Sequence, residues 1–147
     1  MFEDIAASGL LTLIADQRRS LRDIVEGRDE SAIARRPVSG KWSALENIRH
    51  LLFAEQAHLG RYAPGGQQWS SLGYTPQTMR EARNLSRNAS PPLPSLSEVM
   101  AAWDELHLAI VGALATQDSP AVRAALSRNL KHLRAHCNVV QHLVREA

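Results

Sequence analysis

The last third of the chain carries an apolar repeat typical of an amphipathic α-helix. Its apolar residues recur at steps of four and three, the spacing that puts side chains on one helix face. They are Leu126, Leu130, Leu133, Cys137, Val140 and Val144. Val139 and Leu143 widen this arc on one side, at about 100° per residue. The pattern predicts a long helix from Pro120 to the C-terminus with one face in a core.

Two capping boxes mark the starts of two earlier helices. In a capping box, a serine side chain accepts the backbone N–H three residues later, and the residue there bonds back to the serine N–H. The boxes are Ser43–Glu46 and Ser95–Glu98. The helices that they open are expected to run to about Tyr62 and Ala115.

The segment between these two helices differs in composition. Residues 63–94 are rich in Gly, Pro, Ser, Gln and Asn, and they are too many for a plain loop. We expect a crossover with some structure of its own. A short helix should run from Thr75 to about Arg83, and residues 90–94 should be extended.

Four helical segments together predict an all-α fold. A first amphipathic helix is expected over residues 3–26, ended by Gly27. The link at 118–120 is short, so the third and fourth helices should be antiparallel neighbours. We therefore expect a four-helix bundle with a long crossover between helices 2 and 3, and one domain over residues 1–147.

Charge and cysteine content limit which partners and which cellular compartment are expected. The net charge is only +2 and the basic residues are spread along the chain, so no nucleic-acid partner is expected. No run of about 18 apolar residues is present, so no membrane partner is expected either. Cys137 is the only cysteine, which excludes an intrachain disulfide and favours a reducing compartment. The acidic N-terminus is a poor signal peptide, so a cytoplasmic location is expected.

Two histidines of the C-terminal helix fall inside its widened apolar arc. They are His132 and His136, whereas His142 lies on the opposite, polar face. Side chains four residues apart sit one above the other on a helix, so two imidazoles at that spacing can reach one ion. Taken alone, such a pair is more often structural than metal-binding.

His50 lies on a second apolar side of the helix that starts at Ser43, and a buried histidine needs a partner. The ordinary partner of a buried histidine is a carbonyl or a carboxylate, and the alternative is a metal ion. Glu55 projects about 140° away from His50, so we interpret it as a buried partner for an Arg, Trp or Tyr. His58 and His107 have no companion at metal-ligand spacing and are expected in surface or packing roles.

Several of these residues carry a family resemblance. The segment from Arg36 to Leu51 resembles the DinB-like superfamily, in which a proline precedes Trp-Ser, a glutamate three residues on, and His-Leu. The matching residues here are Pro37, Trp42, Ser43, Glu46, His50 and Leu51. The segment 94–103 resembles the family's third helix, and His132 and His136 match its C-terminal His-x-x-x-His. The resemblance covers essentially the whole chain.

This resemblance implies a four-helix bundle, often a homodimer, with a three-histidine site for a divalent metal ion. The ligands would be His50, His132 and His136, and the metal is commonly zinc or nickel. Similar proteins include transferases and isomerases that use low-molecular-weight thiols such as bacillithiol or mycothiol. A small-molecule substrate or thiol is therefore the expected partner. In another register, His136 and Val140 take the family's paired positions, and one ligand is lost.

Two kinds of function follow from the sequence. In the first, a metal with an open coordination position lowers the pKa of a thiol or of water, giving a thiol-dependent S-transferase or a hydrolase. No obvious general base accompanies the histidines, although Glu46 and Glu55 are the nearest candidates. In the second, the chain is a non-catalytic dimerising or ligand-binding bundle with a degenerate site. Cys137 is expected to be an inert core residue.

Overall fold

A computed structural model describes residues 4–77 and 94–146, and these residues form helices joined by loops, without a strand. The elements are α1 (Ala7–Val25), α2 (Glu30–Ala34), α3 (Ala44–Leu59), the 3₁₀ helix η2 (Gly60–Tyr62), α5 (Leu96–Leu114) and α6 (Pro120–Glu146). The all-α prediction is confirmed.

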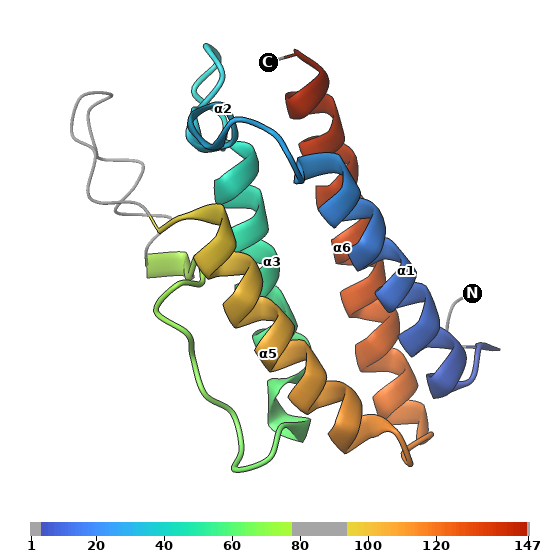
Figure 1. Ribbon diagram of the computed structural model, residues 1–147. Coiled ribbons are helices and arrows are strands. Elements are labelled where there is room, and N and C mark those ends of the chain that lie inside the picture. Colours follow the sequence, from blue (N-terminus) through green and yellow to red (C-terminus); the bar gives the residue numbers. More distant parts are fainter. Residues whose placement is uncertain (1–3, 78–93, 147) are drawn as a thin grey trace.

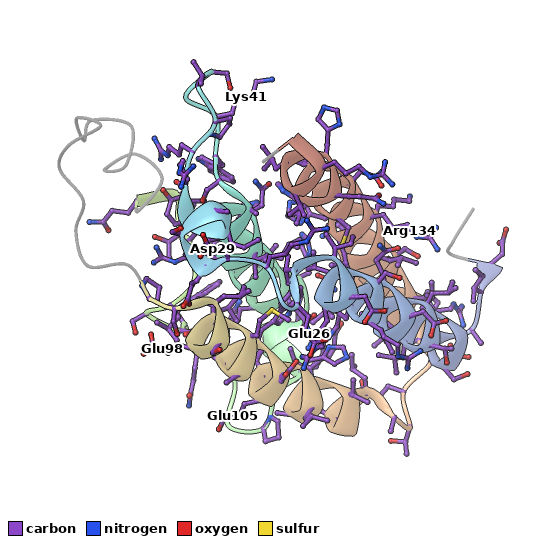
Figure 2. The ribbon with its side chains drawn as sticks, turned by 45° about the horizontal axis from the view of Figure 1, so that its top comes forward. Glu26, Asp29, Lys41, Glu98, Glu105 and Arg134 are labelled. Carbon is purple, nitrogen blue, oxygen red and sulfur yellow. The ribbon has the colours of Figure 1, made fainter. Side chains whose placement is uncertain are left out.

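The four long helices lie side by side, with α5 and α3 on one side of the molecule and α1 and α6 on the other (Figure 1). Helix α6 packs most extensively against α1 and α3. The predicted stripe of α6 is buried along its whole length, from Leu126 to Val144. Charged side chains such as Lys41, Glu98 and Glu105 lie on the outside (Figure 2). The α3–α6 contact is the part of the core that positions the candidate site.

Both predicted capping boxes are present. The Ser43 Oγ accepts the Glu46 N–H at 3.1 Å, and the Glu46 carboxylate accepts the Ser43 N–H at 3.1 Å. Ser95 and Glu98 repeat this arrangement at the start of α5. Helix α1 begins at Ala7, later than expected, and its first N–H donates to the Asp118 carboxylate at 2.8 Å. This long-range cap could not be predicted from local sequence.

The number of helices is larger than predicted. Helix α2 fills part of the expected loop, where the Asp29 side chain accepts the Ser31 N–H as its N-terminal cap. Its five residues bury only Ile33, which is too little to give a periodic signal. The helix expected to end near Tyr62 does reach that residue, with its last turn tightened into η2.

The crossover between η2 and α5 is described over residues 63–77 and 94–95. Helical conformation begins at Pro76 and Gln77, as expected for the short helix. The rest of that helix, to Arg83, and residues 90–93 of the expected extended run lie outside the described residues. In the described part of the chain, no helix combines the length and the apolar character needed to cross a bilayer.

Candidate metal centre

Three histidines from two helices converge where α3 packs against α6. One nitrogen from each of His50, His132 and His136 lies within 4.8 Å of the other two. The Nε2 atoms of His50 and His132 are 3.2 Å apart. The ring centroids are 4.4 Å apart for the α6 pair and 4.9 and 5.0 Å apart across the helices. The chemistry of this donor set fits a divalent metal ion, since imidazole nitrogens suit zinc, nickel and copper.

The helical geometry explains how the α6 histidines come together. His132 and His136 are one turn apart, on the flank of the stripe that α6 buries. All three histidines are half-buried, so a small ligand can approach them. Val140, the residue that the other register would pair with His136, is fully buried in the apolar core. His136 instead shares the cluster with His132.

Asn47 orients the His136 ring. The Asn47 amide nitrogen donates to the Ser43 carbonyl at 2.9 Å, so its Oδ1 is the atom that faces the His136 Nδ1, at 2.8 Å. An amide oxygen only accepts, so the His136 Nδ1 carries the proton and its Nε2 keeps a free lone pair. Metal-binding histidines are commonly held in this way by their second nitrogen.

The other two rings have a different environment. Among the described residues, the Nδ1 atoms of His50 and His132 are buried and have no hydrogen-bond partner in ordinary geometry. Their Nε2 atoms are the ones that approach each other. At 3.2 Å, the Nε2–H of one neutral ring can donate to the Nε2 of the other, with the roles set by the tautomers. The same separation also suits two imidazole nitrogens that each bind one zinc ion at about 2.0–2.1 Å. The two rings therefore fit a shared positive ion.

The protonation of the cluster also suits a metal ligand. Burial lowers the pKa of His132 to about 4, assisted by repulsion from His136, His50 and His58. Burial and the proximity of His50 lower the pKa of His136 to about 4, and burial lowers that of His50. All three imidazoles are therefore neutral at pH 7, which is the form that binds a metal.

The comparison with protein families agrees with this geometry. A model of the DinB superfamily matches residues 13–140, which include all three histidines. The chain belongs to the DinB superfamily. Neither a curated protein nor a solved structure gives a significant match to the chain.

This DinB-superfamily chain surrounds the cluster with aromatic rings. The Trp42 and Phe53 rings lie 5.2 and 6.0 Å from His50. On the α6 side, His58 meets His132 edge to face at 5.7 Å, and its Nδ1 is 3.2 Å from the Asn129 Oδ1. His58 thus has a packing role, as expected, but its contact with the cluster was not predicted. Asn47 was also missed, although a polar residue inside an apolar helix signals a buried partner.

The two candidate general bases are engaged away from the cluster. The Glu46 carboxylate accepts from the Arg36 guanidinium at 2.7 and 2.6 Å and from the Tyr74 hydroxyl at 2.6 Å. Burial alone would raise the pKa of Glu46, but these hydrogen bonds and the Ser43 N–H outweigh it and lower the pKa. Glu46 therefore anchors the start of α3 and is not available as a base.

Glu55 has a partner that the sequence did not identify. Its Oε2 is 3.0 Å from the His107 Nδ1, and both side chains are buried. The expected partner was an Arg, Trp or Tyr. The hydrogen-bonding partner is instead a histidine, and Arg18 of α1 also interacts electrostatically with the Glu55 carboxylate. His107 thus has a partner in the core. The pair forms because α3 and α5 pack together, which a single-helix pattern does not reveal.

Two other predictions are confirmed. His142 is exposed on the polar side of α6, and Cys137 is 2% exposed in the core. Burial raises the pKa of the Cys137 thiol, which keeps it protonated at neutral pH. Cys137 is therefore unsuited to act as a nucleophile.

Proposed function

We propose that this protein binds one divalent metal ion, zinc or nickel, through His50, His132 and His136. The observation that carries the proposal is the convergence of three neutral imidazoles within 4.8 Å of one another. Three histidine ligands are the arrangement of catalytic sites that keep a coordination position open. Asn47 supports the assignment because it fixes the third ring with its free nitrogen available.

The activity that we propose is thiol-dependent S-transfer or, without a thiol, hydrolysis of a small molecule. When bound, the metal supplies Lewis acidity that lowers the pKa of a thiol or of water. The chain's own residues hold and shield the reactants. Trp42 and Phe53 contact the His50 ring, and His58 contacts the His132 ring. We place this activity in the cytoplasm. We also propose that the protein is a homodimer, and light scattering tests this oligomeric state.

A non-catalytic ligand-binding bundle is the second candidate. The observation that favours it is the engagement of both nearby carboxylates, Glu46 by Arg36 and Tyr74 and Glu55 by His107. A site without a base can still bind a ligand through its metal. Full activity of a His50→Ala variant toward any substrate found would exclude the metal-dependent reaction. Binding of a small ligand without turnover would favour the non-catalytic candidate.

Elemental analysis of the untagged protein, purified without chelators, tests metal binding. We expect one equivalent of a divalent metal in the wild type and a loss of it in His132→Ala. The control is His142→Ala, which removes an exposed histidine from the same helix and should keep the metal. A wild type without metal, or a fully loaded His132→Ala variant, would contradict the proposal.

A further inference from the structure

Trp69 is exposed in a way that is unusual for a tryptophan. It is 53% exposed, whereas tryptophan is highly buried on average. Its ring stacks on Phe53, with centroids 5.3 Å apart and an interplanar angle of 25°. Phe53 in turn lies 6.0 Å from the candidate ligand His50. Trp69 therefore extends an aromatic row that begins at the candidate metal centre and ends in solvent.

A buried glutamine holds the segment that carries Trp69. The Gln56 Nε2 donates to the Gln68 carbonyl at 2.5 Å, and its Oε1 accepts the Ser70 N–H at 3.2 Å. These two partners flank Trp69 on either side, and Gln56 itself is only 4% exposed. Its side chain thus fixes the backbone before and after the tryptophan.

Further contacts extend this anchoring along the segment. The Arg49 Nε donates to the Leu72 carbonyl at 2.9 Å, and the Tyr74 N–H donates to the Arg49 carbonyl at 3.0 Å. The segment is therefore tied to α3 on both sides of Trp69. The segment loses its conformational entropy when the protein folds. A ligand that stacks on the ring therefore binds without a further entropy loss from ordering this segment.

Trp69 also lines a hollow of about 300 Å³ together with Gln56, Ser70 and, from α5, Leu106. The lining of this hollow includes neither Phe53 nor any of the three histidines. The hollow therefore does not set the size of a ligand held at the histidines. The stacked rings of Trp69 and Phe53 are what link Trp69 to His50.

We infer that Trp69 is a specificity-determining residue and that the site selects donor ligands carrying a planar apolar group. The inference rests on the proposed function, because a donor atom such as a thiol sulfur must first be anchored at the three histidines. The planar group would then stack against the aromatic row formed by Trp69 and Phe53. Aromatic pairs prefer such offset stacking, and it stabilises them beyond what burial of the same surface alone would give.

Thiol binding to the cobalt(II)-loaded protein tests this inference without measuring turnover. Cobalt is titrated first, and the thiolate-to-cobalt absorption band then reports the affinity for 2-phenylethanethiol and for 1-butanethiol. We expect the wild type to prefer the aromatic thiol by about fivefold, the range expected of one aromatic pair. Trp69→Ala should abolish the preference, and Trp69→Phe should restore most of it. The control, Leu108→Ala, removes another exposed apolar side chain and should keep the preference.

The possible outcomes separate the two proposals. A folded protein that takes up no cobalt overturns both the metal site and the role of Trp69. Uptake of cobalt with the preference unchanged in Trp69→Ala, or with no preference in the wild type, overturns only the role of Trp69. Light scattering on Trp69→Ala gives a further outcome. A change of oligomeric mass with the thiol preference kept would assign Trp69 to a contact between copies of the chain and would also overturn its proposed role.

Discussion

Replacing Asn47 by alanine should weaken metal binding without touching a proposed ligand. The Asn47 Oδ1 accepts from the His136 Nδ1 at 2.8 Å, in a side chain that is only 3% exposed. The Ser43 carbonyl that Asn47 also contacts keeps its backbone bond to residue 47, so the main loss falls on His136. Without the acceptor, the ring can rotate, and its Nε2 no longer has a fixed direction.

The expected size of this effect follows from the partners of metal-binding histidines. Losing such a partner costs about 10- to 100-fold in metal affinity, which is roughly 1.4–2.8 kcal/mol. Competition between the protein and a chromogenic chelator for zinc at pH 7 measures the change directly. Circular dichroism on the same samples verifies that the helices remain.

The chain offers a closely matched control for this experiment. Asn129 is also 3% exposed, and it contacts His58, which is not one of the three proposed ligands. Asn129→Ala should therefore lose a comparable buried hydrogen bond while changing zinc affinity by less than threefold or so. Equal losses of affinity in the two variants, or no loss in Asn47→Ala, would refute the assignment of Asn47 as the residue that positions His136.

Two further predictions concern stability. Glu46→Gln should lower the free energy of unfolding by about 2 kcal/mol, because the amide cannot satisfy Arg36 and Tyr74 as a carboxylate does. Urea denaturation measures this free energy, and a change below about 0.5 kcal/mol would contradict the prediction. The metal-free protein should lose stability as the pH falls from about 6.5 toward 4, because unfolded histidines take up protons there while His132 and His136 stay neutral in the fold. Thermal unfolding at several pH values tests this, and replacing both histidines by alanine should flatten the profile; an unchanged slope would speak against their lowered pKa values.

Most of the helices were predictable because their signals are local. The expected pairing of the third and fourth helices was not: among the described residues, α5 packs mainly against α3, and α6 packs against α1 and α3. The α6 stripe and the capping boxes at Ser43 and Ser95 each lie within one helix, so a pattern of a few residues defines them. Helix α2 escaped prediction because it buries only Ile33. The cap of α1 escaped it because Asp118 is 111 residues away along the chain.

Of the candidate site, only the three clustered histidines were predicted. The spacing of His132 and His136 showed that two rings share one side of α6, and the family resemblance added His50. The contacts made by Asn47, His58 and Glu55 depend on how α3 is rotated against α5 and α6. Periodicity within one helix identifies the side that it buries, but it does not say which residue of a neighbouring helix will face it.

The histidine cluster and Trp69 lie on different segments around α3, and this separation has a consequence for how such proteins can diversify. The three histidines depend on α3 and α6 alone, whereas Trp69 sits on a separate segment tied to α3 through Gln56. If Trp69 selects the ligand as proposed, changes of length or sequence in that segment alter which molecule is accepted while the three histidines stay in place. Grafting the corresponding segment of another superfamily member onto this scaffold would be a direct way to exchange one ligand preference for another.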